Sequence, residues 1–333
     1  MLGGGGFLGY HVVAAGLAVG HEVSVLSRSG SSPHDGVEVL TGDREGDLAA
    51  LRGRQWDAVL DTFTDTSPGA PAIRATAELL HGSVGAYGYV SGMSVYAPSG
   101  PPVPDEGAPV RRQGVEPDND PLQQRSLAKL SAEAVLGAVL DVPVLLPRVG
   151  ILTGPRDPSG RFTYWPRRMA RALSGQRGRT VLVPGALDRA VQHSDARDVA
   201  AWVVAMLAQG RGGTFDTVGP GRRDSLGEVL EACVGAAGGA PGDVQLVEVD
   251  EAFLRPRLGA LPEEGRPLWF PEEQIPQDAI DSTAAIAAGL TFRPARDTAT
   301  DVLGSPADGD VELDTGALGA LEQALLREWA GRR

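Results

Sequence analysis

Residues 3–9 of the chain read GGGGFLG, which satisfies the pattern G-x-x-G-x-x-G at Gly3, Gly6 and Gly9. Glycine permits a tight turn here and lets the backbone approach a pyrophosphate closely, while the N–H groups and the dipole of a following helix attract its negative charge. A helical pattern and then a strand pattern follow, at the spacing of a strand–helix–strand unit. The stretch therefore predicts a dinucleotide-binding loop, and a flexible glycine-rich segment is the alternative.

The residues just before this loop are unusually few. Roughly five apolar residues normally form the central strand of the sheet ahead of such a loop, whereas only Met1 and Leu2 precede Gly3. Either the true start lies upstream, or the central strand is a stub and the affinity for the cofactor is reduced. The cofactor contacts expected from the loop are Gly3, Gly6, Phe7, Leu8 and Gly9.

Short apolar runs alternate with amphipathic stretches through the first half of the chain, a pattern typical of an α/β protein with a parallel sheet. We predict strands at residues 21–26, 37–40, 56–62, 86–91 and 142–146, and helices at 7–19, 47–53, 71–81 and 121–140. In the last of these helices we expect Leu127, Leu130, Ala134 and Ala138 to share one face.

After residue 150 the elements become shorter and more mixed. We predict helices near 162–173, 196–209, 225–236, 281–288 and 313–329, and strands at 180–183, 213–218 and 244–249. The expected organisation is a dinucleotide-binding domain over 1–150, to which 191–218 returns, and a smaller mixed α/β lobe for the substrate over 151–190 and 219–333.

The composition restricts the classes of function. The net charge of −13 argues against binding to nucleic acid or to an anionic membrane, both of which need a basic surface. There is no apolar run of about 18 residues and no signal-peptide pattern, which indicates a cytoplasmic protein. Cys233 is the one cysteine, and no cluster of side chains has metal-ligand spacing. We expect a monomer or a homodimer that acts on a small molecule.

The basic residues are distributed very unevenly between the two types. Of the 30 Lys and Arg residues, 29 are arginine and one is lysine, Lys129. Arginine cannot replace lysine where a compact or titratable ammonium group is required. Lys129 is therefore singled out as a candidate functional residue, and a solvated helix lysine is the alternative.

The residues that follow the predicted strand at 21–26 bear on the choice between NAD(H) and NADP(H). An acidic residue at this position would accept a hydrogen bond from the ribose 2′-hydroxyl of NAD(H), but the chain has Ser27, Arg28 and Ser29. Hydroxyls and a guanidinium suit a 2′-phosphate, so NADP(H) is favoured over NAD(H), unless Arg28 is only a surface arginine. Asp43, after the predicted strand at 37–40, is placed to accept a hydrogen bond from the adenine amine, and a solvated loop carboxylate is the alternative. Arg44 beside it is a further candidate for cofactor binding.

Taken together, the stretches GGGGFLGYHVV, HEVSVLSRS, WDAVLDT, YGYVSGMSVYA, AKLSAEAVL and LLPRVGILTGPRDP resemble the extended short-chain dehydrogenase/reductase superfamily, in its NAD-dependent epimerase/dehydratase branch. The resemblance implies a Rossmann-like doubly wound sheet and a C-terminal lobe that closes over a small substrate. It also implies cofactor contacts at Thr62 and Ser91 and substrate contacts at Gly92 and Met93.

The family's chemistry depends on a Ser or Thr, a Tyr and a Lys, and the resemblance places these at Gly92, Arg125 and Lys129. Lysine is retained, where it would bind the nicotinamide ribose. An arginine cannot shuttle a proton near neutral pH, so Arg125 is left to bind a substrate carboxylate or phosphate, or to face solvent. The active site is therefore expected to be atypical.

Other residues are candidates for the missing proton donor. Tyr96 and Ser94 lie close to Gly92 in sequence, with a structural role as the alternative for Tyr96. Tyr164 lies in the expected substrate lobe, with core packing as its alternative. His193 lies in the segment that returns to the first domain, near the cleft, and a buried histidine with satisfied hydrogen bonds is its alternative. Arg161 belongs to an arginine-rich stretch that suits an anionic substrate group, with a solvated loop as the alternative.

Three hypotheses follow. The first is an NADP(H)-dependent reductase or epimerase of specialised metabolism with a non-standard proton donor. The second is a non-redox enzyme, such as a cyclase, isomerase or lyase, that uses Lys129 or His193 as a base. The third is an NADP(H)-sensing protein without catalysis.

Overall fold

The computed structural model describes residues 1–67, 69–114, 121–258, 267–268, 279–305 and 317–332. It consists of two compact units. Unit 1 comprises Met1–Ile151, Ala196–Gly221 and Ile280–Thr291, and unit 2 comprises Leu152–Asp195, Arg222–Ala279 and Phe292–Arg333. The boundaries expected from the sequence placed all of 219–333 in the second lobe, whereas Ile280–Thr291 lies in unit 1. There the hydroxyl of Ser282 accepts a hydrogen bond from the backbone N–H of Val218 at 3.1 Å.

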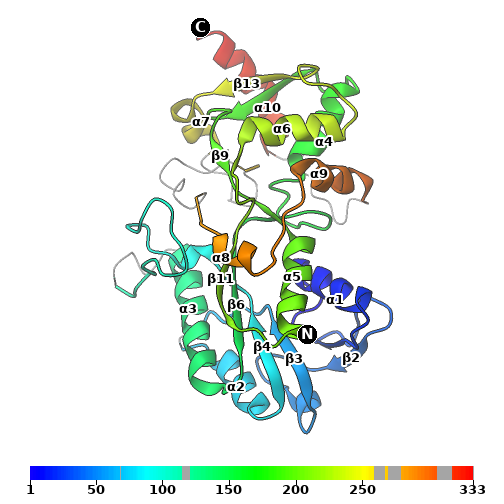
Figure 1. The fold of residues 1–333 in the computed structure, drawn as a ribbon. Helices are drawn as coiled ribbons and strands as arrows, with labels where there is room; N and C mark the ends of the chain where they lie inside the picture. The colour runs from blue at the N-terminus through cyan, green and yellow to red at the C-terminus, as the bar shows by residue number, and fades with distance from the viewer. Residues whose placement is uncertain (68, 115–120, 259–266, 269–278, 306–316, 333) are drawn as a thin grey trace. The chain divides into compact units, whose positions relative to one another are not determined.

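Unit 1 is built on a parallel sheet, which confirms the predicted α/β class (Figure 1). Its strands are β1 (Ser24–Ser27), β2 (Glu38–Thr41), β3 (Trp56–Asp61), β4 (Val84–Tyr89), β6 (Val144–Val149) and β11 (Gly213–Thr217), with the short β5 (Ser91–Gly92) beside β6. β2 pairs with β1, and β3, β4, β6 and β11 follow one another in that order. All of these pairs are parallel, so the carboxyl ends of the strands share one edge.

Leu2 joins the two groups of strands. It forms parallel bridges to Leu26 on β1 and to Asp61 on β3. Its N–H donates to the carbonyl of Leu60 at 2.8 Å, and its own carbonyl accepts from the N–H of Thr62 at 3.1 Å. One residue, Leu2, thus stands between β1 and β3 at the place of a central strand.

The helices of unit 1 pack in two pairs on opposite faces of the sheet (Figure 1). α1 (Phe7–Ala18) packs against α5 (Ala196–Ala208), and α2 (Pro71–Leu80) packs against α3 (Pro121–Val139). The unit also contains α8 (Thr283–Ala287) and the 3₁₀ helices η1 (Ala49–Leu51) and η2 (Met93–Val95).

The four residues that we expected to share one face of α3 do not form its buried face. Ala132, Val135 and Leu136 are buried, whereas Ala134 and Ala138 are exposed. Leu127 and Leu130 are only half-buried. The buried face thus combines apolar residues of different sizes with two polar ones, Gln123 and Ser126.

Unit 2 contains three pairs of short strands and five helices among its described residues. The strands are β8 (Thr180–Pro184) with β13 (Gln245–Val249), β7 (Leu152–Thr153) with β10 (Ser194–Asp195), and β9 (Ala190–Val191) with β12 (Asp224–Ser225). The helices are α4 (Tyr164–Leu173), α6 (Leu226–Ala236), α7 (Glu251–Leu258), α9 (Ala295–Gly304) and α10 (Ala317–Ala330). Cys233 is fully buried on α6, as expected of a core residue.

A capping box sets the start of α6. The hydroxyl of Ser225 accepts from the N–H of Glu228, and the Glu228 carboxylate accepts from the N–H of Ser225. These two reciprocal bonds satisfy donors that the first turn of a helix leaves free.

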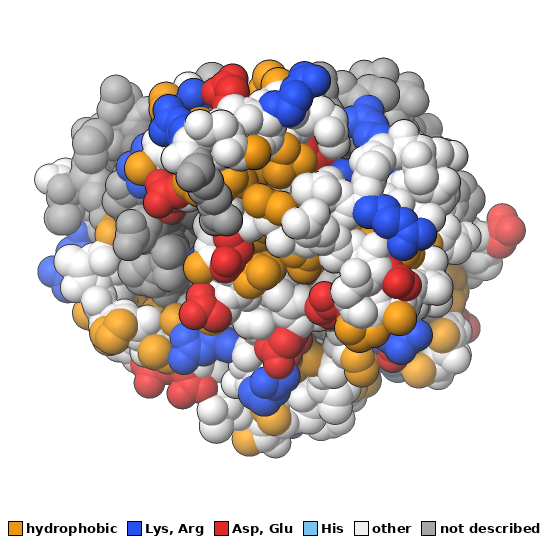
Figure 2. Space-filling view, turned by 90° about the horizontal axis from the view of Figure 1, so that it is seen from above, with side chains coloured by type: hydrophobic (Ala, Val, Ile, Leu, Met, Phe, Trp, Pro, Cys, Tyr) orange, Lys and Arg blue, Asp and Glu red, His pale blue; other side chains and the backbone are white. Residues whose placement is uncertain are grey.

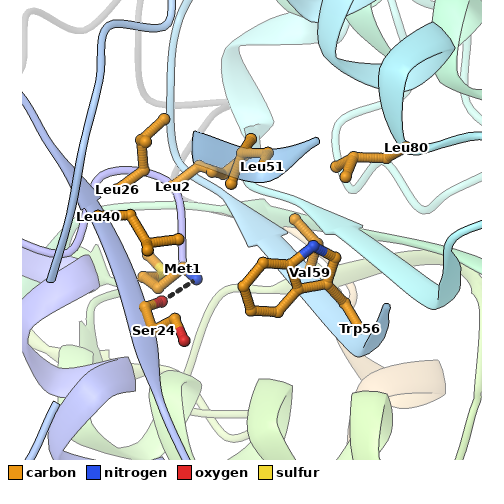
Figure 3. Close-up of a pocket in the computed structure, with 9 residues that line it drawn as sticks. All are labelled: Met1, Leu2, Ser24, Leu26, Leu40, Leu51, Trp56, Val59 and Leu80. Atoms are coloured by element: carbon orange, nitrogen blue, oxygen red, sulfur yellow. Dashed lines mark hydrogen bonds between the residues drawn. The ribbon is translucent and has the colours of Figure 1, made fainter. Parts of the chain in front are cut away.

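A small pocket in unit 1 is lined by Leu2 and by residues of β1, β2 and β3, among others (Figure 3). Its walls are mostly apolar, with Leu26, Leu51, Val59 and Leu80 among them, and they include no titratable side chain. A binding site normally adds convergent polar groups to an apolar lining, so we place the candidate functional site elsewhere.

The surface mixes charges of both signs. Figure 2 shows one face on which acidic and basic side chains are interspersed among apolar ones. None of the described helices is long and apolar enough to cross a membrane.

A fully buried ion pair joins α4 to α10 in unit 2. The guanidinium of Arg168 donates to the carboxylate of Glu322 at 2.9 Å, and neither side chain is exposed. Arg168 also donates to the carbonyls of Arg177 and Thr180, and Glu322 accepts from the N–H of Leu182. Each buried charge therefore depends on the other.

We predict that Glu322→Gln lowers the free energy of unfolding by about 3–5 kcal/mol, because it leaves the Arg168 guanidinium buried without a counter-charge. The control is Glu328→Gln on the same helix, which removes the exposed partner of Arg257 and should cost less than about 1 kcal/mol. Urea denaturation measures both variants, and equal effects would contradict the prediction.

Candidate functional site

The glycine loop closes through contacts that only glycine allows. Gly3 has a φ of +97°, and a β-carbon there would lie 2.2 Å from the hydroxyl oxygen of Thr62. A β-carbon on Gly9 would lie 2.2 Å from the carbonyl oxygen of Gly3. In contrast, nothing lies within 4 Å of the β-carbon position of Gly5, and only the Gly3 carbonyl, at 3.7 Å, approaches that of Gly6. Gly3 and Gly9 therefore serve the packing of the loop, whereas Gly5 and Gly6 border open space.

The N-terminus of α1 faces this open space. Gly6 is its N-cap, no side chain caps it, and its first turn carries no acidic residue. The first N–H groups of a helix have no acceptor within the helix, and among the described residues those of Phe7, Leu8 and Gly9 have none elsewhere. Free N–H groups at the positive end of a twelve-residue helix fit an anion such as a pyrophosphate.

Hydroxyl groups line the turn after β1. The hydroxyls of Ser27 and Ser29 are 3.0 Å apart, and those of Ser29 and Ser31 are 2.8 Å apart. Arg28 is exposed, and in the described part of the chain its guanidinium has no hydrogen bond or ion pair. The imidazole of His34 contacts the backbone carbonyl of Tyr10 at 2.9 Å, which ties this turn to α1.

Asp43 and Arg44 point in different directions. The carboxylate of Asp43 accepts from the N–H of Glu45 at 3.0 Å in the turn after β2. The guanidinium of Arg44 instead turns inward, where it pairs with the buried Asp61 and donates to the hydroxyl of Thr76. Asp61 also accepts from the hydroxyl of Tyr87 at 2.9 Å. The side chain of Arg44 is thus engaged within the protein.

The sole lysine lies at the carboxyl edge of the sheet. Its ammonium donates to the carbonyl of Val90 at 2.8 Å and lies 5.3 Å from the ring centroid of Tyr89. Burial, assisted by the charge of Arg125, lowers the pKa of Lys129 to about 8, although Asp61 and Glu133 act in the opposite direction. A lysine with this pKa exchanges protons close to neutral pH.

Gly92 lies directly beside Lys129. A β-carbon on Gly92 would lie 3.8 Å from Cδ of Lys129 and 3.9 Å from the hydroxyl oxygen of Ser94, both ordinary contact distances. The hydroxyl of Ser91 is buried and has no hydrogen-bond partner among the described residues. Arg125, one turn before Lys129 on α3, is exposed. The structure thus brings Ser91, Gly92, Ser94 and Lys129 together.

Tyr96 belongs to a buried polar network. Its hydroxyl lies 2.7 and 2.8 Å from the carboxylate oxygens of Asp216, to which it donates, and accepts from Arg148 at 3.1 Å. Arg148 in turn donates to Glu133 at 2.8 Å. Burial raises the pKa of Asp216 to about 7, and burial together with Asp216 raises the pKa of Tyr96. Met93 packs against Tyr96 and Val218 on the apolar side of this network.

Sequence reasoning did not identify the other three members of this network. Arg148 interrupts an otherwise apolar strand, VLLPRV, whereas Asp216 lies in the mixed strand GTFDT. A charged residue in an apolar strand requires a partner, so a signal was available for Arg148 and not for Asp216. The identity of each partner was not readable, because Tyr96 and Asp216 are 120 positions apart.

The remaining candidates lie in unit 2. His193 is buried, with Nδ1 3.3 Å from the hydroxyl of Thr153 and its ring 5.0 Å from that of Phe162. Burial lowers the pKa of His193 to about 4, so its imidazole is neutral at pH 7. Burial raises the pKa of Tyr164, and Arg161 is half-buried.

Comparisons with known proteins agree with this geometry. The model of the NAD dependent epimerase/dehydratase family matches residues 1–218. Similar solved structures include UDP-N-acetylglucosamine 4-epimerase from Bacillus cereus, with 17% identity, a TM-score of 0.61, and coverage of 90% of this chain and 96% of that one. A search of curated proteins finds no match.

Two further structures share the fold. MoeE5 in complex with UDP-glucuronic acid and NAD has 19% identity and a TM-score of 0.60, and covers 91% of this chain and 96% of that one. TunA, an NAD-dependent NDP-hexosamine 5,6-dehydratase involved in tunicamycin biosynthesis, has 17% identity and a TM-score of 0.61, with coverage of 91% and 95%.

We predict that Gly9→Ala lowers the melting temperature by several degrees, because its β-carbon would meet the Gly3 carbonyl and such overpacking typically costs about 1–3 kcal/mol. Gly5→Ala is the matched control, since its β-carbon meets nothing. Thermal unfolding followed by circular dichroism compares the two. Equal melting temperatures would show that the loop relaxes around the added methyl group.

A second prediction concerns Asp216, whose pKa is near 7 in the folded protein and about 3.9 in an unfolded chain. The unfolded state therefore loses this proton first, and stability falls as the pH rises from about 4 to about 7 and then levels off. Asp216→Asn should abolish this part of the pH dependence, which is about 1.4 kcal/mol per pKa unit. Urea denaturation of both proteins across this range tests it, and parallel curves would contradict it.

Proposed function

Because this chain belongs to the NAD-dependent epimerase/dehydratase family, we propose that it is a nicotinamide-dependent oxidoreductase or epimerase that acts on a sugar nucleotide and prefers NADP(H) to NAD(H). The observation that carries the proposal is the combination of the free N–H groups at the start of α1 with Lys129 at the same edge of the sheet. The first fits a pyrophosphate, and the second fits a nicotinamide ribose.

The cofactor would be held by groups of unit 1. The open space at Gly5 and Gly6 would take the pyrophosphate, and Asp43 would accept from the adenine amine. Lys129 would donate to the ribose, since Val90 occupies only one of its three N–H groups. When bound, the nicotinamide exchanges a hydride with a carbon atom of the substrate.

Arg28 supports the preference for NADP(H). Its guanidinium is exposed and without a partner in the described structure, and the hydroxyls of Ser27 and Ser29 adjoin it. A guanidinium and two hydroxyls can donate to a phosphate, whereas NAD(H) needs a carboxylate at this position. No side chain from residue 27 to residue 32 is acidic.

A sugar nucleotide is supported as the substrate class by the structural neighbours, two of which are described with a UDP-sugar and one as acting on an NDP-hexosamine. Arg125 adds a feature of this chain itself. It is exposed on the same face of α3 as Lys129, where a guanidinium can pair with a carboxylate or a phosphate of a substrate.

The direct test has two stages. Calorimetric titration with NADPH and NADH measures cofactor binding. Incubation with NADP⁺ and UDP-glucuronic acid or UDP-N-acetylglucosamine then follows the near-ultraviolet absorbance of the reduced nicotinamide and the sugar products. We expect binding and turnover. Failure to bind either cofactor would overturn the proposal, and binding without any turnover would favour a cofactor-sensing protein.

We predict that Arg28→Ala weakens the binding of NADPH by about 10- to 100-fold, the effect of losing charge-assisted hydrogen bonds, and leaves that of NADH unchanged. Arg52→Ala is the control, because Arg52 is also an exposed arginine of unit 1. Calorimetry measures the dissociation constants. A loss of the same size for both cofactors would contradict the assigned role of Arg28.

A further inference from the structure

The site around Lys129 lacks the residue that carries the proton elsewhere in the family. Arg125 stands at the tyrosine position and Gly92 at the serine position. An oxidation or reduction at a carbon–oxygen bond still needs a group that gives or takes the proton of that oxygen. If the proposed function holds, another side chain at this edge of the sheet must supply it.

The neighbouring side chains do not suit this role. The guanidinium of Arg125 stays protonated at every accessible pH. Tyr89 is buried, and burial raises its pKa. The hydroxyl of Tyr96 is engaged by Asp216 and Arg148. Asp61 is buried in its pair with Arg44.

Lys129 meets the geometric requirements. Its ammonium has three N–H groups, of which one donates to Val90, and no other acceptor contacts it among the described residues. The β-carbon position of Gly92 lies 3.8 Å from Cδ of Lys129 and 3.9 Å from the Ser94 hydroxyl, so Gly92 brings these two side chains close together without a side chain of its own between them. One N–H group of Lys129 would serve the ribose, and one remains for a substrate oxygen.

We propose that Lys129 is itself the acid/base of this enzyme and exchanges a proton directly with the substrate oxygen, with Ser94 as an additional hydrogen-bond donor to that oxygen. The proposal rests on the proposed function and adds the identity of the proton carrier. It assigns to one lysine the two tasks that the family divides between a lysine and a tyrosine.

In the oxidation of a secondary alcohol, the neutral amine of Lys129 would take the hydroxyl proton and become an ammonium. The electron pair of the O–H bond would form the second bond of the carbonyl, and the hydride from the broken carbon–hydrogen bond would go to the oxidised nicotinamide that the proposed function supplies. Reduction runs in reverse, with the ammonium as the donor.

The charged and titratable groups around Lys129 determine the pH range in which its amine can accept a proton from the substrate. Arg125 lowers its pKa, and Asp61 and Glu133 raise it, while the ring of Tyr89 packs against the ammonium. Burial prevails, so the amine is partly neutral near pH 8. An ordinary lysine, with a pKa of about 10.4, would be almost wholly protonated there.

The unusual composition allows a direct test that requires no turnover. Protein grown with lysine labelled at Cε yields one lysine signal in a carbon NMR spectrum, because Lys129 is the sole lysine. We expect this signal to titrate with a midpoint near 8. A midpoint above about 10, the ordinary value, would overturn the proposal.

A charge-preserving variant separates proton transfer from cofactor binding. Lys129→Arg keeps a positive charge but cannot titrate, so we expect NADPH to bind within about threefold of its original affinity while turnover falls by at least about 100-fold, the usual contribution of a general base. Turnover at the original rate would overturn the role of Lys129. If NADPH binds neither protein, the proposed function fails instead. Circular dichroism checks that the variant folds.

The pH profile identifies the titrating group. In the oxidation direction, kcat/KM should rise with pH and level off, with a midpoint that coincides with the NMR midpoint of Lys129. Asp216→Asn removes a second buried group whose pKa lies near neutral pH, and the midpoint should persist in this variant. Its disappearance, or a kinetic midpoint more than about one unit from the NMR value, would overturn the proposal.

Discussion

The pairing of Leu2 with both β1 and β3 is the constraint from which the site follows. Parallel strands place their carboxyl ends at one edge of the sheet, and Leu2 aligns the two groups of strands at this edge. The chain leaves Leu2 directly into Gly3, where Thr62 packs against the turn. The glycine loop, the turn after β1 and the segment after β4 consequently meet at the same edge.

A second set of interactions holds α3, the helix that carries Lys129. Glu133 lies one turn after Lys129 and forms an ion pair with Arg148 of β6. The residue after Arg148 on this strand is Val149, and its carbonyl oxygen lies 3.5 Å from the β-carbon position of Gly92. The network through Arg148, Tyr96 and Asp216 therefore determines how Lys129 and Gly92 approach each other. None of the hydrogen bonds described in this network involves Arg125 or Gly92.

Sequence reasoning reached the elements whose apolar pattern is regular, such as α1, β3 and α2, and the loop between Leu2 and α1. The proximity of Gly92 and Lys129 could also be predicted, because the resemblance to a family assigned both residues to the same site. The inward orientation of the Arg44 side chain could not be predicted. Its partner Asp61 lies on β3, and the sequence of that strand does not indicate which cation would pair with it. The return of Ile280–Thr291 to unit 1 involves a hydrogen bond between Ser282 and Val218 and the burial of Ile280 beside Val218, and no local sequence pattern predicts these contacts.

The difference between an ammonium and a guanidinium sharpens the meaning of the single lysine. Binding a ribose hydroxyl requires a donor and a positive charge, and arginine supplies both. Releasing and regaining a proton near neutral pH requires a group that titrates there, and arginine does not. In a chain with 29 arginines, the one position that holds lysine is the one where burial lowers its pKa to about 8. In the proposed mechanism, titration rather than charge is the property that Lys129 contributes and that Arg125, one turn away, cannot.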